Sequence, residues 1–376
     1  MKKYFMPPEW APHRLTLLAW PDNRETWPGD RLNRVEQVYA NILQALVPYE
    51  EVVILTSCPE AHQAASAMIQ NRGLDWNRIR LLRVPVNDVW IRDYGPVTLF
   101  EKQESADTSV TPATSKGNQK VTWKPVMANW GYNAWGGKYP PWDDDDRVPE
   151  QLAGLLGYPF IEPGMILEGG SIDVNGAGTL LTTESVLLNP NRNPALNRQQ
   201  IEEKLRNWLG VDQIIWLKKG LRGDDTDGHI DDLARFVSKD TIMATVCHDR
   251  ADPNYDLLQE NLEILYRAHD LDGQPFKILE LPLPATRIDG TTVDGSDYVP
   301  ASYANFYIAN GCVLVPTYDQ RYDEQVLNLF RPLFQGRRII GIPCKNLVWG
   351  QGSIHCITCQ VPQTIPQKIL FEGYIS

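Results

Sequence analysis

The stretch GGSIDV, at residues 169–174, has two partial copies further along the chain: DGHIDD at 227–232 and QGSIHC at 351–356. All three share the pattern Gly-[Ser/His]-Ile-[Asp/His]. The glycines that open the pattern stand at 170, 228 and 352, so they are 58 and 124 residues apart, close to one and two units of about 60 residues. Such a period predicts a repeat array, in which equivalent segments of different repeats converge on one axis.

Segments of two kinds alternate along the chain. Runs rich in β-branched residues, such as TIMATVCH at 241–248, are typical of strands. Stretches with Leu and Ile at helical spacing, such as RQQIEEKLRNWL at 198–209 and DEQVLNLFRPLF at 323–334, are typical of helices, and Asn197 or Asp323 would serve as N-caps. The alternation predicts an α/β protein.

Two polar segments are predicted to lie at the surface. The first, EKQESADTSVTPATSKGNQK at about 101–120, has few apolar residues and is expected to be a polar surface insertion rather than a linker. A single domain that spans 1–376 is therefore predicted. The second, DDDD at 143–146, is expected to be a solvated turn.

Charge and composition limit the partners and the location of the protein. A net charge of −11 and a pI near 5.1 argue against a nucleic-acid partner, which would require a basic surface. The N-terminal stretch MKKYFMPPEW has no apolar run and is not a signal peptide, and no segment is long enough to span a bilayer. The six cysteines are scattered through a large chain, which predicts free thiols and a cytoplasmic location.

The stretch WGQGSIHCITCQ, at 349–360, contains two cysteines at Cys-x-x-Cys spacing. A structural zinc site usually needs two such pairs, and the chain has only one. A redox pair usually opens a helix, whereas the β-branched residues here favour a strand. A catalytic thiol is the better interpretation. Because neighbouring side chains of a strand point to opposite faces, at most one of Cys356 and Cys359 faces the site, and His355 is expected to be structural or a supporting donor.

A cysteine nucleophile needs a histidine from another part of the fold. Among six histidines, His229 stands out in GDDTDGHIDDLARF at 223–236, because Asp231 follows two residues later and would lie on the same face of a strand. Most of the other acids in this stretch are expected to lie in a solvated turn: Asp224, Asp225, Asp227 and Asp232.

Two further carboxylates lie where apolar runs end. Asp93 falls in NDVWIRDYGP at 87–96, and Glu168 falls in MILEGGSIDV at 165–174. Taken singly, the first could simply pair with Arg92, and the second could be an ordinary turn residue. Together with the repeated pattern, however, they complete a set of residues at comparable strand ends: Asp93, Glu168, His229, Asp231 and Cys356.

One thiol, one imidazole and three carboxylates suit a guanidinium substrate. Carboxylates bind this planar cation bidentately. A thiolate can attack its central carbon, and a histidine can protonate the departing ammonia. A protease or amidase with a thiol nucleophile is the alternative enzyme class, but its neutral substrate carbonyl calls for oxyanion donors rather than for acids.

Seven motifs, in order over nearly the whole chain, resemble those of the agmatine deiminases, which belong with the bacterial-type peptidylarginine deiminases in the guanidine-modifying superfamily. The motifs are MPPEWAPHRLTLLAWP, NDVWIRDYGP, NWGYNAWGG, ILEGGSIDVNGAGTLLTTESVLLNPNRNP, GDDTDGHIDDLARF, ASYANFYIANGCVLVPTYD and GSIHCIT. The resemblance implies a pentein-like, five-bladed α/β propeller of ββαβ-type repeats around a central active site. It also implies hydrolysis of agmatine to N-carbamoylputrescine and ammonia, a step of polyamine biosynthesis, with no metal or organic cofactor.

The resemblance also implies roles for individual residues. Cys356 matches the nucleophile and His229 the general acid/base. Asp93 and Asp231 match the carboxylates that clamp the guanidinium, and Glu168 matches the acid that contacts the histidine and the substrate. Beside the family pattern, Trp90 is a candidate for the wall along the alkyl chain, although a plain core tryptophan is as good an interpretation.

The chain departs from the family pattern next to the nucleophile. The family often carries Gly-Gly-Gly-Asn before Ile-His-Cys and Gln-Gln after the Thr, whereas this chain has Gln351, Ser353 and Cys359 in that stretch. These changes bear on the substrate tail more than on the chemistry. The alternatives that stay open are a deiminase of another guanidine, such as arginine or peptidylarginine, and an amidinotransferase. A homo-oligomer is compatible with the sequence, and the residue that meets the distal ammonium of agmatine is not identified.

Overall fold

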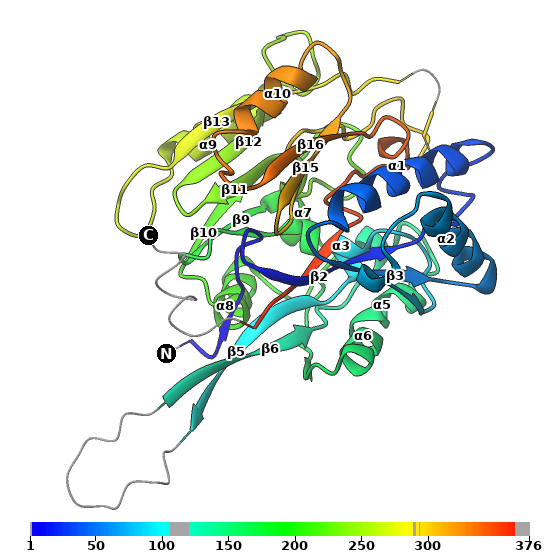
Figure 1. The fold of residues 1–376 in the computed structure, drawn as a ribbon. Helices are drawn as coiled ribbons and strands as arrows, with labels where there is room; N and C mark the ends of the chain where they lie inside the picture. Colours follow the sequence, from blue (N-terminus) through cyan, green and yellow to red (C-terminus); the bar gives the residue numbers. More distant parts are fainter. Residues whose placement is uncertain (1, 106–119, 289–290, 293, 365–376) are drawn as a thin grey trace, which may run out of the picture.

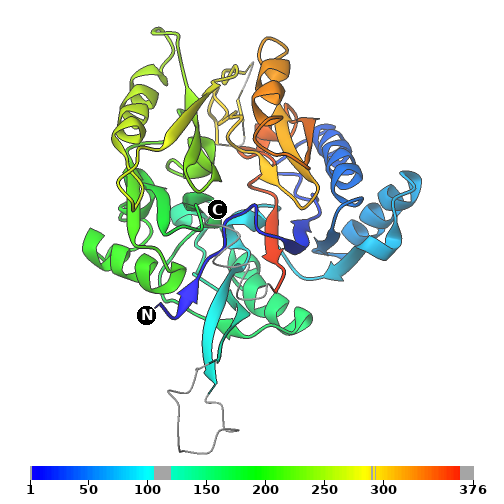
Figure 2. The same cartoon turned by 60° about the vertical axis from the view of Figure 1, so that its left-hand side comes forward.

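The computed structural model describes residues 2–105, 120–288, 291–292 and 294–364. In this part of the chain, five small sheets follow one another around a central axis (Figure 2). Each sheet is one blade, so the predicted five-bladed α/β propeller is confirmed. Among the helices of these residues, none combines the length and the apolar composition that a bilayer crossing requires.

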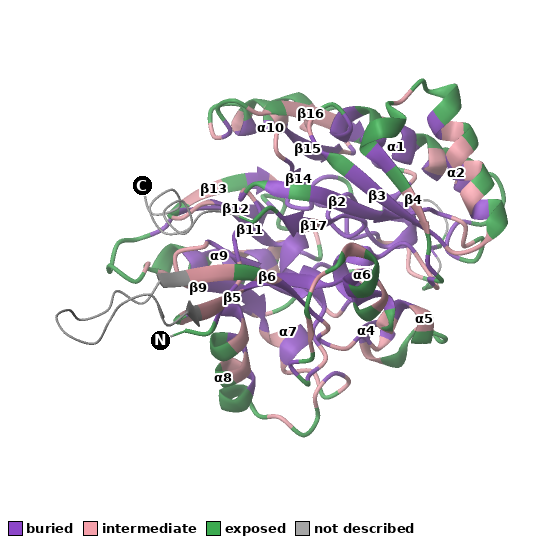
Figure 3. Ribbon diagram, turned by 60° about the horizontal axis from the view of Figure 1, so that its bottom comes forward, coloured by how far each residue is buried: buried purple, intermediate pink, exposed green. Residues whose placement is uncertain are grey.

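Every blade is built on the same three strands. In one of them, β11 (Ala234–Ser238) runs antiparallel to β12 (Thr241–Val246), which is parallel to β13 (Lys277–Pro282). Helix α9 (Tyr255–Arg267) connects the two parallel strands, as parallel neighbours require a crossover. The strands are mostly buried, whereas the helices expose their outer faces (Figure 3).

Two further blades repeat this order. One contains β8 (Asp173–Val174), β9 (Thr179–Thr183), α7 (Glu184–Leu187), α8 (Arg198–Leu209) and β10 (Gln213–Leu217). The other contains β14 (Tyr307–Ile308), β15 (Cys312–Thr317), α10 (Asp323–Phe330) and β16 (Arg338–Pro343). The predicted N-cap at Asn197 is confirmed, since Asn197 and Gln200 form a reciprocal capping box at α8. The predicted N-cap at Asp323 is wrong, because α10 begins at Asp323 itself and Tyr322 precedes it; Asp323 Oδ1 accepts from Tyr318 N (3.0 Å) instead.

The remaining two blades have a fourth strand. One contains β1 (Tyr4–Phe5), β5 (Val97–Ser105), β6 (Lys120–Ala128), α4 (Ala134–Gly137), α5 (Asp143–Asp146), α6 (Val148–Leu156) and β7 (Phe160–Ile161). The other contains β17 (Cys359–Pro362), β2 (His13–Ala19), α1 (Arg31–Leu46), β3 (Glu51–Thr56), α2 (Pro59–Asn71), η1 (Trp76–Arg78) and β4 (Ile79–Arg83). Strands β5 and β6 form a long hairpin that projects from the ring (Figure 1).

The ring is closed by pairing between the two ends of the described chain. Strand β17 runs antiparallel to β2, with Cys359 opposite Leu17 and Gln360 opposite Thr16. In Figure 2 the red strand therefore lies beside the blue segment. Closure removes an exposed strand edge at the join, and it fixes the turn that precedes β17 at the axis of the ring.

In each blade a short turn precedes the strand that opens the ββαβ unit, and these turns carry the candidate functional side chains. They are α3 (Ile91–Tyr94) before β5, η2 (Gly169–Ser171) before β8, η3 (Ile230–Asp232) before β11, residues 302–305 before β14, and the turn 351–358 that follows η4 (Val348–Gly350) and leads into β17. The three copies of the sequence pattern therefore occupy equivalent places in three blades.

The expectation that the thiol segment is a strand is wrong for most of its length. Residues 353–358 form a turn, and β17 begins only at Cys359. The turn is held by local hydrogen bonds, in which Ile357 N donates to Ser353 O (3.3 Å) and Thr358 N donates to His355 O (3.1 Å). The β-branched residues are buried there for packing, which overrides their strand preference.

Both segments that were predicted to be polar surface differ in detail from that prediction. Residues 101–105 and 120 belong to the β5–β6 hairpin, and 106–119 fall outside the described residues. The stretch 143–146 is a short helix rather than a solvated turn, and Asp145 is buried. Its carboxylate accepts a hydrogen bond from Asn87 N (2.7 Å), which gives the burial a structural reason.

Candidate active site

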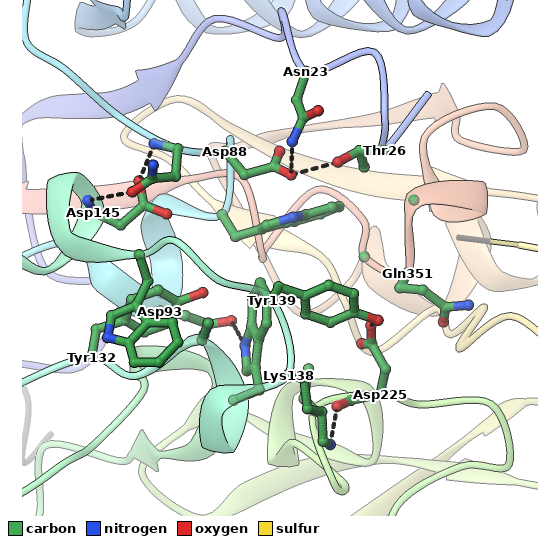
Figure 4. A pocket seen from close by; sticks show the side chains of 18 of the residues that line it. Asn23, Thr26, Asp88, Asp93, Tyr132, Lys138, Tyr139, Asp145, Asp225 and Gln351 are labelled. Carbon is green, nitrogen blue, oxygen red and sulfur yellow. Dashed lines mark hydrogen bonds between the residues drawn. The ribbon is translucent and has the colours of Figure 1, made fainter. Parts of the chain in front are cut away.

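A cavity of about 270 Å³ opens at the turns that converge on the axis (Figure 4). Three of the predicted residues, Cys356, Asp93 and Trp90, line it directly, whereas Glu168, His229 and Asp231 are not among its lining residues. Aromatic side chains form much of its wall: Trp90, Tyr132, Trp135, Tyr139 and Trp142. Further carboxylates in the lining are Glu25, Asp88, Asp145 and Asp225. A small, concave site with aromatic walls and convergent polar groups is typical of a small-molecule site.

Cys356 lies in the turn before β17 and is 6% exposed. Its Sγ is 3.2 Å from Asn305 Nδ2, which donates to it, and 3.9 Å from Asp231 Oδ2. Its carbonyl accepts from Arg92 N (3.1 Å), which fixes the backbone. Burial, with the nearby negative charge of Asp231 and its neighbours, raises the pKa of the Cys356 thiol well above its ordinary value.

His229, Asp93 and Asp231 meet around Gly170. His229 Nδ1 is 3.6 Å from Asp93 Oδ1. A Cβ on Gly170 would lie 2.6 Å from His229 Nδ1, 2.7 Å from Asp93 Oδ1 and 3.0 Å from Asp231 Oδ2. The glycine of the first sequence motif is therefore required by the close approach of three functional groups.

Asp93 is held by two donors and is not paired with Arg92. Trp135 Nε1 donates to Asp93 Oδ2 (3.0 Å), and Gly170 N donates to Asp93 Oδ1 (2.9 Å). Burial raises the pKa of the Asp93 carboxyl to about 6, although the neighbouring His229 opposes this. The Arg92 side chain instead donates to Glu9 Oε2 (3.3 Å) behind the site.

Asp231 is oriented by a chain of buried charges. His355 Nδ1 is 2.7 Å from Asp231 Oδ2, and His355 Nε2 is 2.8 Å from Glu9 Oε2. Burial acts against ionisation of Asp231, but the hydrogen bond and the charge of His355 prevail and lower its pKa. Arg235 lies 3.0 Å from Glu9 and holds the pKa of that acid well below its usual value, despite the cost of burial. His355 is thus the supporting donor that the sequence predicted.

Glu168 and His229 are each held by a hydrogen bond from within their own part of the chain. Arg192 Nε donates to Glu168 Oε1 (2.5 Å), and the backbone N of His229 donates to Asp224 Oδ2 (3.1 Å). Burial would lower the pKa of His229, but the charges of Asp93, Asp231 and Glu168 outweigh it and raise that pKa.

The predicted residues carry an unusual number of buried polar atoms without a partner. Among the residues that the structure describes, both ring nitrogens of His229, Oδ1 of Asp231 and Oε2 of Glu168 have no hydrogen bond. Such atoms cost free energy when they are buried, so their concentration at one place indicates a polar ligand that is bound during function.

The expectation of a solvated turn for the acids around His229 is wrong. Asp232 is buried and accepts from Asn305 Nδ2 (3.0 Å), and Asp225 lines the cavity. Asp227 Oδ2 accepts from Arg192 Nη1 (2.6 Å). The turn packs against neighbouring blades, from which Asn305 donates to Asp232 and Arg192 donates to Asp227. These hydrogen bonds stabilise carboxylates that bulk water does not fully surround.

Sequence reasoning missed several residues that support the site: Glu9, Asn305, Trp135 and Arg192. Glu9 lies in the motif MPPEWAPHRLTLLAWP, which contributed to the family resemblance but assigned no role to Glu9. Asn305 lies in the motif ASYANFYIANGCVLVPTYD, at one of the two turns that lack the Gly-[Ser/His]-Ile pattern, so the sequence included it without assigning it a role. In the described residues, no group of three or more His, Cys, Asp or Glu side chains is arranged to hold a metal ion.

A five-bladed α/β propeller with a buried thiol, an imidazole and carboxylates at its axis is the architecture of the guanidine-modifying enzymes. The chain belongs to the Porphyromonas-type peptidyl-arginine deiminase family, whose model matches residues 5–362.

Relatives within this family are similar over almost their whole length. The agmatine deiminase of Stutzerimonas stutzeri is 35% identical over 377 residues, which cover 96% of this chain and 95% of the relative. The solved structure of the agmatine deiminase of Enterococcus faecalis is 29% identical, with a TM-score of 0.82, and the match covers 96% of this chain and 97% of that one. A cysteine-to-serine variant of the C. jejuni agmatine deiminase, solved with substrate bound, has a TM-score of 0.80, 29% identity and the same two coverages.

Proposed function

We propose that this protein hydrolyses agmatine to N-carbamoylputrescine and ammonia. One observation carries the proposal: a buried thiol, an imidazole and three carboxylates lie close together near the axis, and the buried polar atoms of Glu168, His229 and Asp231 that have no hydrogen bond in the described residues support a polar cation as the ligand. Family membership and full-length similarity to agmatine deiminases support it. The activity makes the protein a hydrolase of C–N bonds in linear amidines, and the proposed setting is polyamine biosynthesis in the cytoplasm.

The guanidinium binds between Asp93 and Asp231. Both carboxylates are buried, and their charges favour a cation that can use several N–H donors at once. Glu168 Oε2 and Asp231 Oδ1 gain partners when such a ligand arrives, because neither has one in the described residues without it. The carboxylates therefore position the central carbon of the guanidinium near the sulfur of Cys356.

The positive charge of the substrate activates the nucleophile. The carboxylates raise the pKa of Cys356 and of His229, and the guanidinium offsets that negative charge, so both pKa values fall when it binds. Neutral His229 takes the thiol proton as sulfur adds to the carbon, and it returns the proton to the departing amine. Ammonia leaves, and a Cys356 thiouronium adduct remains.

Hydrolysis of the adduct completes the reaction. His229 removes a proton from water, whose oxygen adds to the thiouronium carbon. The tetrahedral adduct then collapses, the C–S bond breaks, and the sulfur leaves as a thiolate that regains its proton. The carbon retains one amino group, the alkylamino group and the new oxygen, which is N-carbamoylputrescine.

The charge of the cavity favours agmatine over arginine. Lys138 is the only lysine or arginine among the described residues that line it, and its Nζ already donates to Asp227 Oδ1 (2.8 Å). The α-carboxylate of arginine would therefore face an excess of acids without a free cation. A substrate with a second positive charge, such as agmatine, would instead be attracted by these acids.

Ammonia release from agmatine, arginine and a blocked arginine ester, measured side by side, tests the proposal. Agmatine should be the best substrate by at least about tenfold in kcat/KM, since each tenfold preference needs about 1.4 kcal/mol. Cys356→Ala should abolish turnover but still bind agmatine in calorimetry. Turnover that survives in Cys356→Ala, or preference for either arginine substrate, would show the proposal to be wrong.

A further inference from the structure

Gln351 occupies a backbone position that is strained for any residue except glycine. Its φ is +77°, in the left-handed region, where the family often has a glycine. Its neighbours must be glycines, because a Cβ on Gly350 would lie 2.6 Å from the ring of Trp27 and one on Gly352 would lie 2.3 Å from the ring of Trp90. A glutamine at the centre of this segment costs conformational free energy, which a function of its side chain would offset.

The amide of Gln351 has one fixed orientation. Its Nε2 donates to Thr292 Oγ1 (2.8 Å) and to Asp294 Oδ1 (3.0 Å). The Thr292 hydroxyl donates its own hydrogen to Asp294, so both partners of the amide act as acceptors toward it. If the amide were flipped, its oxygen would face these two acceptors. The nitrogen must therefore face Thr292 and Asp294, and Oε1 remains available to a donor from elsewhere.

The oxygen of this amide has no partner among the described residues. Gln351 is 5% exposed, its Oε1 is buried, and the side chain lines the same cavity as Cys356. A buried carbonyl oxygen without a donor costs free energy until a donor arrives. Gln351 Oε1 is thus a neutral hydrogen-bond acceptor that a ligand in the cavity can use.

The surroundings of Gln351 are suited to a cation. Figure 4 shows Gln351 and Asp225 on one side of the cavity and Asp93 on the other, with the ring of Tyr139 between them. Asp225 Oδ2 accepts from Tyr139 OH (2.6 Å), and Lys138 Nζ donates to Asp227 Oδ1 and to the backbone carbonyl of Asp225 rather than to its carboxylate. Burial raises the pKa of the Asp225 carboxyl to about 7, and a cation that arrives beside it favours the ionised form. The aromatic wall between the two sides fits an alkyl chain.

We propose that Gln351 is a specificity-determining residue, whose Oε1 accepts a hydrogen bond from the distal ammonium of a guanidine substrate that carries a second cation. This inference rests on the proposed function and adds the group that recognises the substrate tail. Asp225 adds long-range attraction at the same side of the cavity, while the amide oxygen supplies the directional contact.

The test compares agmatine with n-pentylguanidine, in which a methyl group replaces the ammonium. In Gln351→Gly the backbone keeps its conformation, but the acceptor is lost. The ratio of kcat/KM for agmatine to that for n-pentylguanidine should fall about tenfold to a hundredfold, which is the usual worth of a hydrogen bond to a charged group. The kcat/KM for n-pentylguanidine should change less than about twofold, because its tail makes no such bond.

Thr292→Val is the matched control. It removes one hydrogen bond that tethers the amide but leaves Oε1 in place, so the ratio should stay that of the unaltered protein. An unchanged ratio in Gln351→Gly, or an equal fall in Thr292→Val, would overturn the inference. Failure of the proposed function looks different: the unaltered protein would not hydrolyse agmatine at all, and both statements would then be wrong.

Discussion

At the scale of single residues, the site is a group of buried carboxylates whose negative charge is not balanced by the thiol and the imidazole between them. Asp93, Asp231 and Glu168 lie close to one thiol and one imidazole, and water does not screen them. All three raise the pKa of His229, and Asp231 and Asp93 add to the effect of burial in raising the pKa of Cys356. A flat cation is the one ligand that relieves this imbalance and supplies donors for the unpartnered oxygens.

The pKa of Asp93 predicts an acid limb in the pH–rate profile. Burial raises this pKa to about 6, so the carboxyl is neutral below that pH and ionised above it. Only the ionised form clamps the guanidinium, and only neutral His229, whose pKa is raised above its ordinary value, takes the thiol proton, so the kcat/KM for agmatine should already be falling as the pH drops through about 6. Because kcat/KM reports the free enzyme, a profile from pH 5 to 9 measures this directly. An acid limb near the ordinary aspartate value of about 3.9 would contradict it.

At the scale of elements, the turns before the first strands decide the function. The sequence pattern located three of these turns, because the close approach of side chains at the axis demands glycine. The side chains of these segments were assigned to faces as if the segments were strands, and that assumption was wrong. His229 and Asp231 come together through the short helical turn η3, and Cys356 stands in a turn before β17. The turn before β14 carries Asn305 without the glycine pattern, so the motif ASYANFYIANGCVLVPTYD included this residue, but its place beside the thiol emerged only from the structure.

Gly170→Ala tests the role of these turns. The added methyl would lie 2.6 Å from His229 Nδ1 and 2.7 Å from Asp93 Oδ1, closer than real contacts allow. A displacement of this size should lower the kcat/KM for agmatine about a hundredfold or more, while the protein still folds.

The control for this substitution is Gly154→Ala in helix α6, where a Cβ meets nothing within 4 Å. It should leave activity unchanged and raise stability by about 0.5–1 kcal/mol in chemical unfolding, since glycine is unfavourable inside a helix. Equal activity of the two variants would show that the space around Gly170 does not matter.

At the scale of the whole molecule, the alternation of segments and the repeat period predicted an α/β repeat array, the family resemblance implied a five-bladed ring, and pairing of β17 with β2 closes that ring. Two things could not be predicted from composition or period. One is the burial of acids in 143–146 and 224–232, because it depends on donors from other blades. The other is the position of Glu9, which joins Arg92, Arg235 and His355 only after the ring has closed. The predictions of a single domain and of a homo-oligomer stay predictions.

The acidity of the molecule predicts that salt slows capture of the substrate. The net charge is −11, and carboxylates dominate the cavity lining. Electrostatic attraction of a dication is screened at high ionic strength. The kcat/KM for agmatine should fall about two- to tenfold between about 50 and 500 mM NaCl. The singly charged n-pentylguanidine should lose less, and an equal loss for both substrates would argue against attraction of the second charge.

The central claim is that the sulfur of Cys356 bonds to the guanidinium carbon during turnover. Acid quenching of the protein within a few turnovers of agmatine, followed by peptide mass spectrometry, tests it most directly. The account predicts a mass increase of agmatine less ammonia on Cys356, retained in Cys359→Ser and absent in Cys356→Ala. An adduct on Cys359, or active protein in which no cysteine ever gains mass, would contradict the account.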